Sequence, residues 1–181
     1  MWIALIVVVV LLIVWIIGVY NNLVSLKMRV KNAWAQIDTQ LKRRFDLIPN
    51  LVETVKGYAA HEQGTLEKVI AARNTYASAT SVEDKAKANN ELTSTLKSIF
   101  ALGEAYPELK ANENFLALQT ELAGTEDKVA YSRQFYNDTV QMYNTAIMKF
   151  PNNILAGMFG YKEEPFFTID DAEKEPVKVQ F

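Results

Sequence analysis

The sequence contains few residues whose types and spacing could support catalysis. His61 and Glu62 begin like a zinc-protease motif, but the chain has one histidine, so the second histidine ligand is missing. We interpret the pair as polar residues at a helix junction. The lack of cysteine excludes disulfides, thiolate nucleophiles and cysteine-bound metals. No phosphate-loop, dinucleotide-binding or nucleophile-elbow motif occurs. The sequence therefore predicts a protein that is not an enzyme and that has no cofactor or metal site.

A second set of polar residues lies in register with apolar residues that recur every seven positions. Buried charges are costly unless they are paired. One interpretation places these side chains at the edges of helix contacts, with packed stems and solvated charges. The sharper hypothesis is a set of ionic and polar contacts between helices that fixes their register. A catalytic role is the least favoured, because no nucleophile or metal accompanies them. The candidates are Arg44, Glu62, Arg73, Glu126, Arg133, Asn137 and Asn144.

Two Tyr-Asn dipeptides stand seven residues apart, at Tyr136-Asn137 and Tyr143-Asn144. Tyrosine can bury its ring while its hydroxyl finds a hydrogen-bond partner, and asparagine beside a helix contact can bond across it. We favour a role in core specificity over ligand binding for both dipeptides.

Apolar residues spaced by seven run through most of the chain, whereas no useful length alternates with period two. Leu23, Val30 and Ile37 form one such row in a first helix, which we expect to continue unbroken from the apolar N-terminus. Pro49 interrupts the pattern. It either kinks this helix or lies in the first turn of a new one.

Three further features define the later helices. The likeliest break after Pro49 is at 61–64, and a shorter helix is expected over 81–102, followed by a turn that Gly103 and Pro107 bracket. A last, nearly continuous helix is predicted from about 108 to 149. Its row of residues seven apart is Phe115, Leu122, Val129, Tyr136, Tyr143 and Phe150.

The expected fold is all-α. A transmembrane helix (1–21) continues into an elongated antiparallel bundle of about four long or medium helices (22–160). An apolar patch after Pro151 suggests a short amphipathic helix. The acidic tail (161–181) is predicted to be extended or disordered. Its aromatic residues are candidate docking points: Phe166, Phe167 and Phe181.

The N-terminal segment is unbroken and apolar from Trp2 to Ile17, with no charged side chain before Lys27. About 20 such residues span the roughly 30 Å hydrocarbon core of a bilayer. A cleaved signal peptide is the alternative. Such a peptide has a basic start, a shorter apolar run and a small-residue cleavage site, and this segment has none of these features. We therefore expect a retained, single-pass anchor.

Positive charge gathers beside this segment. Residues 20–60 carry seven Lys/Arg and three Asp/Glu, although the whole chain has a formal net charge of −2. Because Lys27, Arg29 and Lys31 follow the span, we expect the helical domain in the cytoplasm. Nucleic-acid binding is not expected, since the basic residues lack interleaved aromatic residues.

Many segments, spread over nearly the whole chain, match one known family. They are Tyr20-Asn21 through Val30, Trp34, Asp38, 41–44, 46–52, His61-Glu62, 104–110, Glu126, Arg133, Tyr136-Asn137, Tyr143-Asn144 and Phe150-Pro151. In these segments the sequence closely resembles the LemA family. The resemblance implies a protein of the bacterial inner or plasma membrane with one N-terminal span, a helical-bundle domain and no known enzyme activity.

Three hypotheses of function follow. The leading one is a membrane-anchored, non-catalytic scaffold whose partners are the lipid bilayer and further copies of the same chain. The alternative is an accessory adaptor or sensor for a membrane enzyme such as a protease, which requires a membrane-protein partner. An enzyme of unrecognised type is the least favoured.

Overall fold

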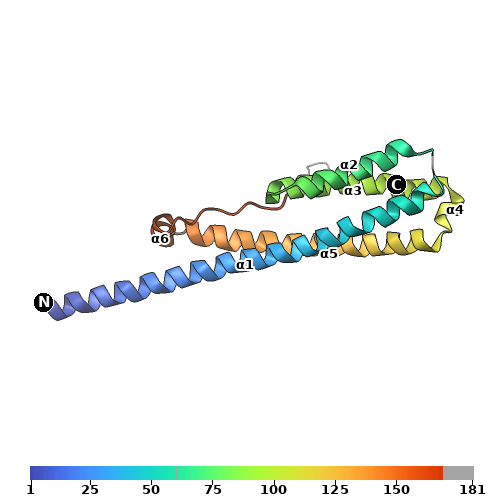
Figure 1. Cartoon of the computed structure of the whole chain (residues 1–181). Helices are drawn as coiled ribbons and strands as arrows, with labels where there is room; N and C mark the ends of the chain where they lie inside the picture. The colour runs from blue at the N-terminus through green and yellow to red at the C-terminus, as the bar shows by residue number, and fades with distance from the viewer. Residues whose placement is uncertain (60, 169–181) are drawn as a thin grey trace, which may run out of the picture. The chain divides into compact units, whose positions relative to one another are not determined.

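The computed structural model describes residues 1–59 and 61–168. Within these residues the structure is entirely helical apart from its connections, and the predicted all-α class is confirmed (Figure 1). The helices of this part are α1 (Trp2–Lys56), α2 (Gln63–Ser78), α3 (Val82–Ala105), α4 (Pro107–Lys110), α5 (Glu113–Met148) and α6 (Asn152–Met158).

Helix α1 is 55 residues long and contains Pro49. The predicted continuation of the apolar N-terminus into the first helix is therefore correct, and the alternative in which Pro49 starts a new helix is wrong. A proline inside a helix costs about 3 kcal/mol. Its neighbours Ile48, Leu51 and Val55 are all fully buried, and their packing offsets that cost.

The breaks between helices lie near the predicted positions. Helix α1 ends at Lys56 and α2 starts at Gln63, so the break lies a few residues before the predicted 61–64, of which Gln63 and Gly64 are in α2. Helix α3 starts after Ser81, whose hydroxyl accepts a hydrogen bond from the backbone N–H of Asp84 at 3.0 Å. This N-cap satisfies one of the unpaired donors of the first turn.

Three details of the later helices were predicted wrongly. Gly103 lies inside α3 rather than in the turn. The last long helix starts at Glu113, not near 108, because the Asn112 side chain accepts a hydrogen bond from the Phe115 N–H and caps a new helix. Phe150 is 80% exposed, because α5 ends at Met148 and the apolar row ends with it.

The chain divides into two compact units, and α1 and α5 each contribute to both. Unit 1 comprises Met1–Ile37 and Ser132–Phe166, and unit 2 comprises Asp38–Tyr131 together with Phe167 and Thr168. This division does not test the predicted boundaries at residues 21 and 160, which stay predictions.

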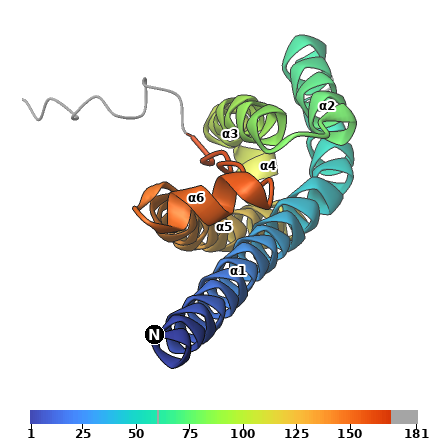
Figure 2. The ribbon, with the colours of Figure 1, turned by 90° about the vertical axis from the view of Figure 1, so that its left-hand side faces the viewer.

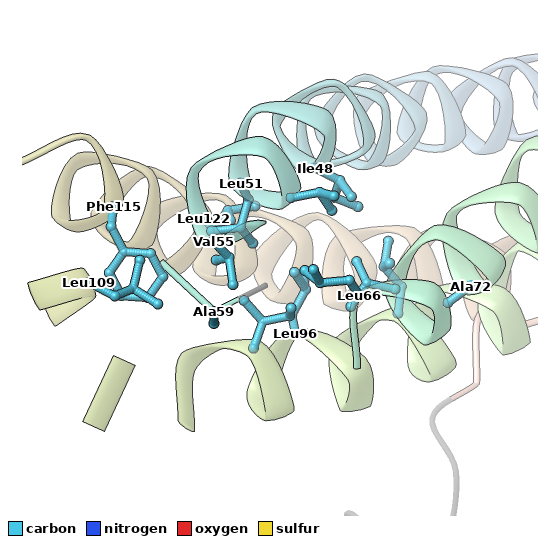
Figure 3. Close-up of a cluster of buried hydrophobic side chains, with 14 residues drawn as sticks. Ile48, Leu51, Val55, Ala59, Leu66, Ala72, Leu96, Leu109, Phe115 and Leu122 are labelled. Atoms are coloured by element: carbon cyan, nitrogen blue, oxygen red, sulfur yellow. The ribbon is translucent and has the colours of Figure 1, made fainter. Parts of the chain in front are cut away.

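Unit 2 packs parts of α1 to α5 around one apolar cluster (Figure 3). Leu51 and Val55 of α1 meet Leu66 of α2, Leu96 of α3 and Phe115 of α5 in this cluster. Each helix buries one face, as amphipathic helices in bundles do.

Unit 1 pairs the first part of α1 with the last part of α5, and α6 and residues 161–166 complete it (Figure 1). Leu23, Val30 and Ile37 of α1 are buried, as their spacing predicted. Tyr136 and Tyr143 of α5 are also buried, and the Tyr136 ring lies edge-on to that of Trp34 at 5.6 Å.

The close approach of α3 and α5 yields a first prediction. A Cβ at Gly103 would lie 2.8 Å from Cε1 of the buried Phe115 ring. Gly103→Ala is therefore expected to destabilise the protein by about 1–3 kcal/mol. Urea denaturation of the full chain in detergent, followed by circular dichroism, measures the change.

Gly124→Ala is the matched control, because nothing lies within 4 Å of a Cβ at that helical position. Without a clash, alanine should stabilise a helix by about 0.5–1 kcal/mol. Equal gains in stability for the two variants would contradict the proposed contact.

Candidate functional site

A buried arginine forms the centre of the main polar cluster in unit 2. Arg44 of α1 is 3% exposed, although its position in an apolar row predicted only that it lies near a helix contact. Its Nη1 atom lies 2.8 Å from Oε2 of Glu126 and 2.9 Å from both Oδ1 of Asn89 and Oγ1 of Thr93. The guanidinium thus joins α1, α3 and α5.

This geometry favours the ionic-contact hypothesis over the solvated-edge interpretation for Arg44. Burial of the charge is tolerated because a carboxylate and two neutral acceptors surround it. The Glu126 side chain as a whole is 42% exposed, but Oε2, the atom that contacts Arg44, is buried. That the pair fixes helix register stays a prediction.

A second polar cluster in unit 2 combines aromatic rings and charges. The Arg73 guanidinium lies 3.8 Å from the centre of the Phe45 ring, and the Phe45 and Tyr76 rings are 5.9 Å apart. Lys85 forms an ion pair with Asp38. Burial, and to a lesser extent the Asp38 carboxylate, raises the pKa of Tyr76 well above its usual value.

An open groove lies beside this cluster. Its lining includes Asp38, Lys42, Phe45, Asp46, Tyr76 and Lys85, but not Arg73. The tyrosine is held neutral and the lysine is paired, so neither is an activated nucleophile or base. Arg73 lies outside this groove, with its guanidinium over the Phe45 ring.

Glu62 lies in a different part of unit 2. It precedes α2 and accepts a hydrogen bond from the Tyr106 hydroxyl at 3.1 Å. That hydrogen bond is the main cause of a raised pKa at Tyr106, because it stabilises the protonated hydroxyl. His61 beside it is exposed. This hydrogen bond joins the connection before α2 to the turn before α4.

The two tyrosines and Asn144 of α5 bind the start of the tail in unit 1. The hydroxyls of Tyr136 and Tyr143 donate to the backbone carbonyls of Pro165 and Lys162, at 2.8 and 2.9 Å. The Asn144 amide donates to the carbonyl of Glu164 and accepts from its N–H, both at 2.9 Å. Burial raises the pKa of Tyr143, with a smaller contribution from the Glu164 carboxylate.

The start of the tail is therefore fixed, although it lacks regular secondary structure. Phe167 is fully buried within unit 2, so its ring is not accessible for docking to a partner, whereas Phe166 is partly exposed. Phe181 lies outside the described residues.

The remaining candidates, Arg133 and Asn137, are half-buried on α5. Of the seven polar candidates, the structure brings Arg44 and Glu126 into direct contact, while Glu62, Arg73 and Asn144 each have other partners. Among residues 1–59 and 61–168, no three His, Cys, Asp or Glu side chains are grouped so that they could hold a metal ion.

Sequence reasoning missed the polar residues of α3 that complete these clusters. Asn89 and Lys85 lie seven residues before Leu96 and Leu92, two buried residues of α3. The register test that selected Arg44 and Glu126 would have found them if it had been applied to this helix.

Comparisons of the sequence with known proteins identify its family. The sequence model of the LemA family matches residues 33–181, more than four-fifths of the chain. The chain belongs to the LemA family. Protein LemA of Metamycoplasma hominis is 29% identical over 166 residues, which cover 89% of this chain and 74% of that protein.

Other relatives of this LemA-family protein match a shorter region. Magnetosome protein MamQ 2 of Paramagnetospirillum magneticum is 32% identical over 79 residues, and MamQ of Magnetospirillum gryphiswaldense is 30% identical over 79. Each match covers 44% of this chain and 29% of the relative. The apolar start of α1 is long enough to cross a membrane. This apolar helix and the membership of the LemA family together point to a membrane-associated protein.

Burial should decide the strength of two neighbouring ion pairs. The exposed pair of Arg43 with Glu121 also joins α1 to α5, at 2.7 Å, and serves as the matched control for Arg44 with Glu126. Double-mutant cycles with Arg→Met and Glu→Gln changes, measured by urea denaturation, give each coupling energy. We expect about 1–3 kcal/mol for the buried pair and about 0.2–1 kcal/mol for the exposed pair. Similarly small coupling energies for both pairs would contradict the hypothesis that Arg44 fixes the register of the helices.

Proposed function

We propose that the protein is a non-catalytic helical scaffold, anchored in the bacterial inner or plasma membrane by one N-terminal span and facing the cytoplasm. The observation that carries this proposal is a change along α1. Residues 1–15 are exposed on every side and almost wholly apolar. From Leu23 onward the same helix buries a single stripe. A helix that is apolar all round suits lipid, whereas a striped helix suits a bundle.

The proposal assigns the buried polar groups a structural role. Arg44 is paired with Glu126, and Asn144 is paired with the tail. Active sites need positioned acids, bases or metals, and these groups bind other parts of their own chain instead. Surface contacts are therefore the favoured means by which this protein acts.

The basic residues after the span predict its orientation. Lys27, Arg29 and Lys31 should keep the helical part in the cytoplasm. The chain has no cysteine, so one introduced at the exposed Ser98 would be the sole target for a membrane-impermeant maleimide. Labelling is expected only after the cells are lysed. Labelling of intact spheroplasts would contradict the cytoplasmic orientation. Recovery of the full-length chain from the soluble fraction would contradict the membrane anchor.

The scaffold proposal includes self-association. Phe135 and Met142 are exposed, and they lie seven residues apart on α5, so they share one side of the helix. When isolated native membranes are treated with an added oxidant, we expect Phe135→Cys and Met142→Cys to form disulfide-linked dimers. Asn32→Cys, at an exposed polar position in α1, should form far fewer. Size measurement of detergent-purified protein checks the result, and a monomer at all concentrations would contradict it. Capture of a different membrane protein by these cysteines would favour the adaptor alternative.

A further inference from the structure

A long uncharged stretch near the C-terminus lies beside the end of the apolar segment of α1. Residues 150–161 contain no charged side chain, and Lys149 and Lys162 flank them. Within unit 1, the Phe159 ring lies edge-on to the Tyr20 ring of α1, with the ring centres 5.0 Å apart. Asn152 and Lys149 line a groove with Asn22 of α1. Helix α6 is thus held at the level of residues 20–22 of α1.

Coverage of α1 by the rest of unit 1 starts at this level. Within residues 1–20, Ile16 and Val19 are half-buried and the others are exposed. Leu23, one turn further on, is fully buried. Figure 2 shows α6 lying across the end of α5, on the side toward which α1 projects to its N-terminus.

Two large apolar side chains are exposed on α6, beside Asn153 and Gly157. Leu155 and Ala156 are its buried residues, whereas Ile154 and Met158, four residues apart, are 55% and 75% exposed. Phe150, just before the helix, is exposed as well. In water this face would be unfavourable, because each of these side chains leaves apolar area hydrated.

Both ends of α6 are fixed, so this face has a defined direction. At its start, the Asn153 N–H donates to the carbonyl of Lys149. At its end, Gly160 has a φ of 70°, and the Tyr161 N–H donates to the carbonyl of Ala156 at 2.9 Å. This is the hydrogen-bond pattern of a Schellman cap, which stops a helix sharply.

The polarity of unit 1 changes within two turns of α1. Beyond α6 the chain turns toward Lys27, whose Nζ lies 3.9 Å from the Glu164 carboxylate and 5.6 Å from the centre of the Tyr161 ring. Seven residues of helix separate Tyr20 from Lys27, or about 10 Å. Aromatic and apolar groups thus gather at one level and charges at the next, as at a membrane–water interface.

We propose that α6 and its flanking residues form a second membrane contact, with Phe150, Ile154 and Met158 inserted at the interface of the bilayer that α1 spans. The inference rests on the proposed span. If Tyr20 marks its end, α6 lies within the headgroup region, because that layer is only about 5–8 Å thick on each side of the hydrocarbon core. Lys149 and Lys162 would then lie near anionic headgroups, which attract basic residues.

The test uses the full chain with single introduced cysteines carrying a nitroxide spin label. The protein is reconstituted in nanodiscs of phosphatidylcholine and phosphatidylglycerol in a 3:1 ratio. Accessibility to oxygen, which enriches in lipid, is compared with accessibility to a water-soluble nickel chelate. Ile154→Cys and Met158→Cys report on α6, and the exposed polar position Gln134 of α5 provides the aqueous control. Val10→Cys reports on the span itself.

We expect the ratio of oxygen to nickel accessibility at 154 and 158 to be several-fold higher than at 134, and lower than at 10. Aqueous values at 154 and 158 with a lipid value at 10 would overturn this inference and leave the anchor intact. An aqueous value at 10 would overturn the proposed function as well. Labels at 154 and 158 shielded from both reagents would mean that protein covers α6, which also overturns the lipid contact.

Discussion

Burial of apolar side chains that recur every seven residues is the constraint on which the rest of the structure depends. Seven residues are close to two turns, so such a row stays on one side of a helix and must pack against another element. In α5 this row is Phe115, Leu122, Val129, Tyr136 and Tyr143, and every member is almost fully buried. Each large side chain contributes about 1.5–3 kcal/mol when it leaves water.

The two tyrosines in this row couple the core to the tail. A phenylalanine at either position would bury the same ring but would leave a backbone carbonyl of the tail without its donor. Tyr136 and Tyr143 instead direct their hydroxyls to Pro165 and Lys162. Asn144 adds two backbone hydrogen bonds beside them. A segment without a helix or strand of its own is thereby held on α5, because its polar backbone groups are paired with side chains.

The sequence predicted the helices well because rows of apolar residues are a local signal. Leu23, Val30 and Ile37 were expected to be buried and are. Helix ends were less predictable, because they depend on single caps. Asn112 starts α5 later than the apolar row suggested. At the other end, α5 stops at Met148, so Phe150 falls outside the helix and is exposed. Pro49 is a case in which packing overrides a local signal. Proline disfavours a helix interior, but buried neighbours on both sides of Pro49 keep α1 intact.

The polar contacts were only partly predictable, for a different reason. An in-register position indicates that a charge lies near a helix contact, but its burial depends on what the facing helix provides. For Arg44, Asn89 and Thr93 of α3 provide acceptors, and Glu126 of α5 provides the carboxylate. Arg73 lies instead over the Phe45 ring. The partner of a buried charge comes from another helix, so one helix's sequence cannot identify it.

The proposed membrane contacts have a joint consequence that neither has alone. One transmembrane helix fixes the depth of a protein, but its tilt and rotation depend on additional contacts near the interface. Helix α6, held to α1 through Tyr20 and Phe159, would supply such a contact. Unit 1 would then present the side of α5 that carries Phe135 and Met142 in a constant direction relative to the membrane. Copies oriented alike in one plane can meet through the same surface repeatedly, which is the geometry that a membrane-bound scaffold needs.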